Sequence, residues 1–474
     1  MQSQGSRREF LKLSALGLAA SAAATAFPES AYSLPPGTSA ITTRVTHGRE
    51  RFAQGPTLKW GGGTPVAETI KLDPTRRFQE IFGFGAAFTD AACYNFNQLS
   101  PSARDQLFHE LFHPSELGLS VGRTCIGSSD YATKAYSFDD GEADPELQRF
   151  SIEHDRAYIL PMLRQARAVN PELFLFSSPW SPPGWMKTGG SMLGGSMRKS
   201  YFSSYAHYFL KFIDAYRSEG VPIQAITVQN EVDTDQDGHM PACLWGQEYE
   251  IEFVRDHLGP LLEASKRDTQ IWILDHNYNL WGRVMDELED PGVRKYATAV
   301  AWHGYGGAAE MAGKVHDAYP DIPMHWTEGG PDYTNPDYAT DWTHWGRTFT
   351  AALRNWCRSI TGWNLALDEK GRPNIGPFSC GGMVTINSQS RELSRSGQYW
   401  AMSHFARCLR RGAHRFASEA RLQGLDHVAC ENPDGQKVLI VTNTGPSRTL
   451  TLQVGSSTAN FTCEADSINT LLWT

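Results

Sequence analysis

Three features that point to common protein classes are absent from this chain of 474 residues: a basic cluster beyond the N-terminus, a C-x-x-C pair and a complete G-x-G-x-x-G loop. The net charge of −9 and the absence of a basic run argue against binding of nucleic acid and give no reason to expect strong attraction to anionic lipid. Gly83-Phe-Gly85 lacks the third glycine, which weakens the case for an open, doubly wound dinucleotide-binding sheet. No stretch after residue 31 is apolar enough to span a bilayer, so we expect no integral membrane segment.

Cysteine is scattered, with eight residues and no regular spacing. This pattern disfavours zinc sites and redox motifs, and we expect no bound metal. An oxidising compartment permits disulfides, but the spacing does not show how these residues would pair. We therefore expect mostly buried free thiols.

The first 31 residues have the features of an export signal. Residues 6–12 read SRREFLK, a twin-arginine pattern, and a short run of apolar and small residues follows up to Ala26. Residues 24–26 (ATA) fit an A-x-A cleavage site. This order of features predicts export of the folded protein to the periplasm or beyond the cell.

Short apolar or β-branched runs recur along the next part of the chain and alternate with segments of helical spacing. Residues 32–56 are rich in Pro, Gly, Ser and Thr and are interpreted as a linker, and strand-like runs occupy 57–80. Eight strand–helix alternations across 81–412 favour a (β/α)8 barrel over an open sheet. The eight runs are 81–90, 118–127, 173–181, 225–232, 269–277, 297–305, 323–330 and 359–367.

From about residue 413 the pattern changes to strands separated by Asn, Gly, Pro and Ser turns. Residues 438–442, 448–453 and 467–473 are the clearest of these strands. This pattern of short strands and turns predicts a small β-sandwich over 413–474. The strand-like segment 57–80, which precedes the barrel, is placed to complete this sandwich, so the second domain would be discontinuous.

Polar side chains stand at the carboxyl ends of the eight runs, and in a barrel these ends converge on the face that holds active sites. Glu231 ends the fourth run and Glu328 ends the seventh. Two carboxylates about 5 Å apart match the retaining mechanism of glycoside hydrolysis, in which one protonates the leaving oxygen and the other attacks the anomeric carbon. Asn230 is suited to hydrogen-bond a sugar hydroxyl, and Gly329-Gly330 allows close backbone approach. A surface salt bridge is the alternative for either glutamate alone.

Five motifs occur in the order typical of one enzyme family. They are FGFGAAFTDAA from Phe82, SPWSPPGWMK from Ser178, VQNE ending at Glu231, TEGG from Thr327 and GWNLAL from Gly362. Together they resemble glycoside hydrolase family 30, the glucosylceramidase-like family, from about residue 57 to the C-terminus. The resemblance implies a barrel fused to a β-sandwich, a retaining mechanism and no cofactor.

By motif position the resemblance implies that Glu231 is the acid/base, Glu328 the nucleophile and Asn230 the residue that holds the sugar 2-hydroxyl. Asp130 is similar to the residue that grips the distal hydroxyls of a bound glucose. Tyr305 is placed to hydrogen-bond the nucleophile, and Arg123 to pair with one of the glutamates. The remaining pocket candidates are Asp90, Trp180, His303 and Trp363, and for the aromatic ones the alternative interpretation is a packed core residue.

The substrate is less constrained than the reaction. Many relatives have Pro after the acid/base, whereas this chain has Val232, and the loop 233–243 is unlike the glucosylceramidase version. The first hypothesis is a β-glucosidase acting on glucosylceramide, β-1,6-glucan or other β-glucan fragments, or aryl glucosides. The alternatives are a β-xylosidase or xylanase of the same family and a non-catalytic carbohydrate-binding barrel. Asp233, Asp235 and Asp237 resemble the start of a calcium loop, but Leu244 stands where its last acidic ligand belongs, which favours a solvated loop.

Overall fold

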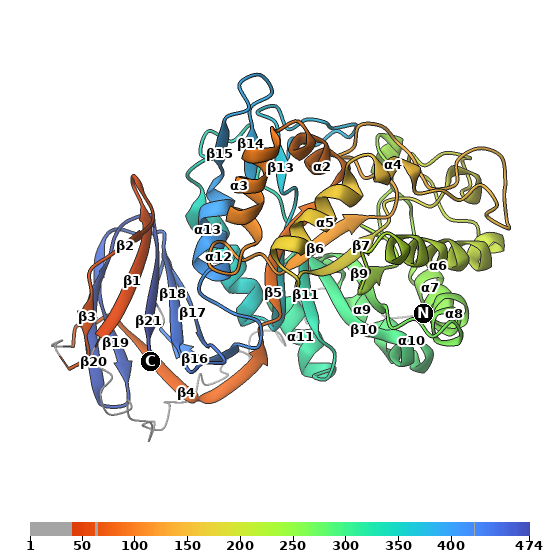
Figure 1. Cartoon of the computed structure of the whole chain (residues 1–474). Coiled ribbons are helices and arrows are strands. Elements are labelled where there is room, and N and C mark those ends of the chain that lie inside the picture. Colours follow the sequence, from red (N-terminus) through yellow and green to blue (C-terminus); the bar gives the residue numbers. More distant parts are fainter. Residues whose placement is uncertain (1–39, 62–64, 421) are drawn as a thin grey trace, which may run out of the picture.

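The computed structural model describes residues 40–61, 65–420 and 422–474, which form two lobes side by side (Figure 1). The predicted export signal over 1–31 lies outside these residues. No helix in the described ranges is long and apolar enough to cross a membrane. All eight cysteines lie within them, all are free thiols and six are buried, which confirms the expectation from their spacing.

The larger lobe is a closed barrel of eight parallel strands, in the order β10-β11-β12-β5-β6-β7-β8-β9. Each strand falls at one of the eight predicted runs, so the predicted (β/α)8 barrel is confirmed. The strands are β5 (Gly83–Phe88), β6 (Val121–Cys125), β7 (Phe174–Ser178), β8 (Ala225–Thr227), β9 (Gln270–Asn277), β10 (Ala297–His303), β11 (Met324–Glu328) and β12 (Cys357–Gly362).

Helices cover the outside of the barrel. In α3, Ser100 caps the first turn by accepting from the Ala103 amide and Pro101 occupies the first position, while Leu107 and Leu111 face the core as their spacing predicts. The helices are α2 (Asp90–Asn97), α3 (Pro101–Phe112), α4 (Glu153–Arg156), α5 (Ile159–Val169), α6 (Phe202–Ser218), α7 (Gln247–Glu252), α8 (Gly259–Ala264), α9 (Trp281–Glu289), α10 (Pro291–Tyr296), α11 (Glu310–Ala318), α12 (Trp342–Arg354) and α13 (Gly397–Ala406), with the π-helical turn η4 (Phe253–Leu258) joining α7 to α8.

The smaller lobe is a β-sandwich built from both ends of the described chain. Its strands pair in the order β2-β1-β21-β18-β17-β16-β4-β19-β20, with the short β3 beside β1. They are β1 (Ala40–His47), β2 (Glu50–Gln54), β3 (Leu58–Lys59), β4 (Thr69–Glu80), β16 (His414–Glu419), β17 (Leu425–Glu431), β18 (Lys437–Asn443), β19 (Arg448–Val454), β20 (Ser457–Cys463) and β21 (Ser467–Trp473).

The prediction of a linker over 32–56 is wrong from residue 40 onward, because β1 and β2 lie there. Ile41 and Thr43 are buried, and β1 pairs with β21 over five residues. The threonines in this segment suit a strand as well as a linker, since β-branched residues fit a pleated, half-buried surface.

The barrel interior changes from apolar to polar along the strands. Phe176, Ala225 and Trp272 belong to a buried cluster inside the barrel, where Trp272 stacks on His325 with ring centroids 4.2 Å apart. Two residues further along β7 and β8, Ser178 and Thr227 are buried and polar. Side chains on one face of a strand alternate with period two, so this step places a polar layer directly beneath the carboxyl-end face of the barrel.

The sandwich packs against α12 and α13. Trp342 Nε1 donates to the carbonyl oxygen of Asp466 at 3.0 Å, and His404 is hydrogen-bonded to Thr470 and Thr46, each at 2.8 Å. These contacts tie α12 and α13 to the loop before β21 and to both ends of the discontinuous lobe.

Candidate active site

Glu231 and Glu328 meet at the carboxyl-end face of the barrel, on opposite sides of one histidine. His303, at the end of β10, is fully buried, and its Nδ1 lies 3.5 Å from Glu231 Oε1. Its Nε2 lies 3.9 Å from Glu328 Oε2. Two carboxylates separated by about 100 residues of sequence therefore contact the same imidazole ring.

Glu231 is held by an unusual backbone. Its φ is +54°, a left-handed conformation that costs a non-glycine residue about 1 kcal/mol or more and is concentrated at functional sites. The Glu231 amide donates to the carbonyl oxygen of Asp275 at 3.1 Å, and Gln236 Nε2 donates to its carboxylate at 2.9 Å. Burial raises the pKa of Glu231, but the neighbouring His303 and His276 outweigh it, so the pKa lies below its ordinary value.

Glu328 ends β11 and has two fixed partners. Arg123 Nη1 donates to Glu328 Oε2, and the exposed Tyr305 donates its hydroxyl to Glu328 Oε1 at 3.2 Å. Gly329, the next residue, leaves no room for a side chain, because a Cβ there would lie 2.3 Å from Trp326. Arg123 therefore pairs with Glu328, one of the two partners expected from the sequence, and Tyr305 lies where the resemblance implies.

A buried aspartate that the sequence analysis did not select connects these groups. Asp275 Oδ2 accepts from Arg123 Nη2 at 2.8 Å and from the hydroxyls of Ser178 and Thr227, each at 2.7 Å. Its Oδ1 accepts from Thr327 at 2.8 Å and lies 3.1 Å from His303 Nε2.

These interactions set the charges at the centre of the site. Burial alone would raise the pKa of Asp275, but Arg123 and the hydrogen-bond donors hold it well below the ordinary range. Burial lowers the pKa of His303, whereas Glu328, Asp275 and Glu231 outweigh it and raise the pKa to about 9. Asp275 thus contacts both Arg123 and the protonated His303 and fixes the orientation of these two cations.

Replacing Asp275 with Asn is expected to destabilise the fold by about 3–5 kcal/mol, because it removes one of the two buried counter-charges of Arg123 and the carboxylate that accepts from three buried hydroxyls. The measurement is the free energy of unfolding in urea at neutral pH. Asp268→Asn is the matched control, since the Asp268 side chain is 97% exposed, and it should unfold like the wild type. Equal stability of the two variants would contradict the assigned role of Asp275.

A pocket of about 490 Å³ opens above the two glutamates. Trp180 and Trp363 form one wall and stack on each other with centroids 5.0 Å apart. Asn230 and Asp130 also line it, and Asn230 Oδ1 accepts from Arg123 Nη2 at 2.8 Å. Burial, together with the nearby glutamates, raises the pKa of Asp130 well above its ordinary value.

The structure does not bring Asp90 into this pocket. Its carboxylate lies 2.5 Å from His154 Nε2, accepts from the Tyr158 hydroxyl at 2.9 Å and also accepts from the Thr133 amide. Asp90 therefore belongs to a separate buried cluster beside α2, although it follows a barrel strand as predicted.

The acidic loop after Glu231 is used differently from a calcium loop. Asp233 Oδ1 lies 2.6 Å from His276 Nε2, and Asp235 accepts from the amide of Asp237 within the loop. Among the described residues, these three aspartates do not form a cluster of metal-ligating atoms. His276 follows Asp275 on β9, so the polar triplet 275–277 at the end of the fifth run was the signal for both residues.

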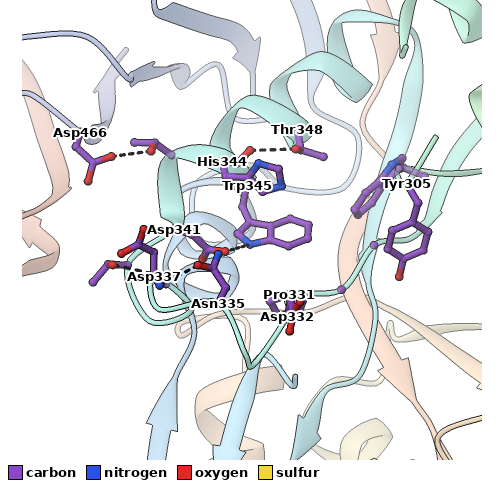
Figure 2. A pocket seen from close by; sticks show the side chains of 16 residues that line it. Tyr305, Pro331, Asp332, Asn335, Asp337, Asp341, His344, Trp345, Thr348 and Asp466 are labelled. Atoms are coloured by element: carbon purple, nitrogen blue, oxygen red, sulfur yellow. Dashed lines mark hydrogen bonds between the residues drawn. The ribbon is translucent and has the colours of Figure 1, made fainter. Parts of the chain in front are cut away.

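A second pocket, of about 570 Å³, adjoins the first and shares Tyr305 with it (Figure 2). It extends from Gly329-Gly330 toward the sandwich, where Asp466 contributes to its lining. Trp345 lies between these ends and donates to Asp341 at 3.1 Å. Tyr305 is thus a wall common to the site that holds the glutamates and to a polar cavity behind it.

Comparison with known proteins agrees with this geometry. The family model described as the glycosyl hydrolase family 30 TIM-barrel domain matches residues 81–409, and the family 30 beta sandwich domain matches 412–471. The chain is 31% identical over 408 residues to the endo-1,6-β-D-glucanase of Neurospora crassa, covering 81% of this chain and 84% of that protein. It is 28% identical over 430 residues to the lysosomal acid glucosylceramidase of Mus musculus, covering 85% and 83%.

The solved structures include the endo-β1,6-glucanase BT3312, which superposes with a TM-score of 0.83 and 28% identity over 92% of this chain and all of that one. The family models together cover most of the chain, in the order in which the barrel and the sandwich occur. The chain therefore belongs to glycosyl hydrolase family 30 and is a glycoside hydrolase.

Proposed function

We propose that this chain is a retaining β-glycosidase that hydrolyses β-glucosides, with Glu328 as nucleophile and Glu231 as acid/base. The observation that carries the proposal is the meeting of both carboxylates at His303, at the mouth of a pocket with aromatic walls. A double displacement needs one carboxylate ionised against the anomeric carbon and the other near the leaving oxygen.

The surroundings of Glu328 suit a nucleophile. Arg123 and Tyr305 each donate to one of its oxygens, which orients the carboxylate and, in the case of Arg123, favours its ionised form. In the first step Glu328 attacks the anomeric carbon and forms a glycosyl ester. The leaving oxygen takes a proton from Glu231 as its bond to carbon breaks.

In the second step Glu231 accepts a proton from water, which attacks the anomeric carbon and releases Glu328. A lowered pKa suits this base role, while the first step needs the same carboxyl protonated. Asn230, held by Arg123, is placed beside both glutamates to bind the sugar 2-hydroxyl.

We propose β-1,6-linked glucan as the substrate that this chain prefers. Two relatives described above are β-1,6-glucanases, and the net charge of −9 gives no attraction for an anionic lipid surface. The likeness to lysosomal acid glucosylceramidase makes glucosylceramide, and with it a role in sphingolipid metabolism, the second candidate.

The twin-arginine pattern over residues 6–12 supports a proposal of export as a folded protein. An exported glucanase would act on polymer outside the cytoplasm, which agrees with a soluble polysaccharide as substrate.

The test of substrate choice is a panel of β-1,6- and β-1,3-gluco-oligosaccharides, glucosylceramide in detergent micelles, and aryl β-glucoside and β-xyloside. The β-1,6-linked oligosaccharides should give the highest kcat/KM, and Glu328→Gln should be inactive on all. Faster turnover of the xyloside or of xylan would favour a xylanase instead. Binding without turnover of any member would favour a carbohydrate-binding barrel.

Hydrolysis is expected to retain the anomeric configuration. The first sugar released from a β-glucoside should be the β-anomer, because two successive inversions at the same carbon restore the starting configuration. Proton NMR of the anomeric region during the first minutes of reaction measures this before mutarotation. An α-anomer as first product would exclude the double displacement.

A further inference from the structure

Two buried histidine nitrogens beside Glu231 have no hydrogen-bond partner. They are Nδ1 of His276 and Nδ1 of His303. His276 is 6% exposed and His303 is fully buried. Both nitrogens face the same atom, Glu231 Oε1, at 3.8 Å and 3.5 Å. A buried polar atom without a partner is costly, so a site that leaves two of them aimed at one carboxylate needs an explanation.

The opposite nitrogen of each ring is anchored by a carboxylate. His276 Nε2 lies 2.6 Å from Asp233 Oδ1, and His303 Nε2 lies 3.1 Å from Asp275 Oδ1. Metal-binding histidines usually donate their second ring N–H to such a carboxylate, which fixes the ring orientation and leaves the first nitrogen free to coordinate. Here that arrangement occurs twice around a single point.

The three atoms also match the size of a metal site. One atom each from Glu231, His276 and His303 lies within 4.8 Å of the others. Ligands of a tetrahedral zinc ion at about 2.0–2.1 Å stand about 3.3 Å apart, so the side chains need only a modest closure. Two imidazoles and one carboxylate are the donor set of several catalytic zinc sites and are unsuited to Ca²⁺ or Mg²⁺, which take oxygen ligands.

We propose that Glu231, His276 and His303 bind one divalent transition-metal ion, with Zn²⁺ as the best match, and that this ion inhibits the enzyme reversibly. The inhibition rests on the proposed role of Glu231, whereas the binding does not. On binding, the metal displaces the proton that His303 Nδ1 carries, and it occupies the carboxylate oxygen that must exchange a proton with substrate and water. Glu231 and His276 both line the pocket, so a sugar hydroxyl or water from the pocket would complete the coordination.

The first experiment measures Zn²⁺ binding to the full-length protein without a histidine tag, by competition with a chromophoric chelator. We expect one site in the wild type. His276→Gln should remove it, and Asp233→Asn should weaken it about 10–100-fold through loss of the anchoring carboxylate. The Asp233 side chain is 43% exposed, so we expect Asp233→Asn to fold. It therefore tests the metal site even if His276→Gln does not fold.

The chain offers a matched control. His109 and His113 lie one turn apart on and just after α3, with stacked rings 4.4 Å apart, and are the competing place for adventitious metal. The double variant His109→Gln/His113→Gln should bind Zn²⁺ like the wild type. Loss of the site in this control, unchanged affinity in both His276→Gln and Asp233→Asn, or no binding by the wild type would each overturn the proposal.

The second experiment measures hydrolysis of an aryl β-glucoside over the same range of Zn²⁺. Activity should fall by at least 10-fold at saturation, with a midpoint at the measured Kd, and return after addition of chelator. If zinc binds at the three residues without lowering activity, the proposal that the ion inhibits the enzyme is wrong. A protein with no glycosidase activity would refute the proposed function, while the binding experiment would still decide whether the metal site exists.

Discussion

Replacing Glu328 with Gln is expected to lower kcat by on the order of 10⁴-fold or more, with little change in the fold. The amide cannot form the glycosyl ester, so the two-step route is closed and only binding and electrostatic stabilisation remain. Arg123 keeps its ion pair with Asp275 in this variant, so its charge stays partnered. The measurements are kcat on an aryl β-glucoside and the thermal unfolding temperature.

Glu263→Gln is the matched control, because the Glu263 side chain is 60% exposed on the helical surface. It should retain full activity. Sodium azide added to Glu328→Ala tests the nucleophile assignment through the product that forms. Azide enters the space left by the carboxylate and attacks the anomeric carbon once, which gives the inverted α-glycosyl azide. A variant that keeps more than about one tenth of wild-type kcat would refute the nucleophile assignment.

Much of the fold could be predicted from the sequence because the barrel repeats one physical pattern. Short apolar runs alternate with helical segments, and each run became a strand. The two glutamates were also accessible, since the carboxyl ends of parallel strands converge whatever the loops between them do. The places of Glu231 and Glu328 at the ends of two runs predict that they meet on one face, whereas their separate roles were inferred from the motif resemblance.

Asp275 was missed because its strand departs from regular alternation. Trp272 faces the barrel interior, so a period of two predicts Leu274 inside and Asp275 outside. Instead Leu274 and Asp275 have φ values of +72° and +53°, and the pairing with β10 shifts register there. The irregularity turns Leu274 outward into the core beneath the helices and Asp275 inward to Arg123.

The predictions of a pocket position for Asp90 and of a linker over residues 40–54 were wrong for a different reason. A polar side chain at a strand end can point into the central pocket or outward toward the surrounding helices. Asp90 points outward and contacts His154 and Tyr158, a cluster that only tertiary packing creates. The strands β1 and β2 are stable because β21, more than 400 residues away, supplies the edge on which β1 pairs. Local composition contains no information about that partner.

Replacing Glu231 with Ala is expected to affect substrates according to their leaving groups. A sugar leaves poorly without a proton, so kcat/KM for a β-linked gluco-oligosaccharide should fall by about 10²–10⁴-fold. A dinitrophenolate leaves without one, so kcat/KM for the corresponding aryl β-glucoside should stay within about 10-fold of wild type. The measurement is kcat/KM for aryl glucosides across a range of phenol pKa values, where the variant should show the steeper dependence.

Azide then separates the two glutamates by stereochemistry. In Glu231→Ala the glycosyl ester on Glu328 still forms but water attacks it slowly, because no base remains to accept a proton. Azide needs no base, so it should accelerate turnover and give the retained β-glycosyl azide, the opposite anomer from Glu328→Ala. If both variants gave the same azide anomer, or if Glu231→Ala slowed all leaving groups equally, the assignment of these two roles would be wrong.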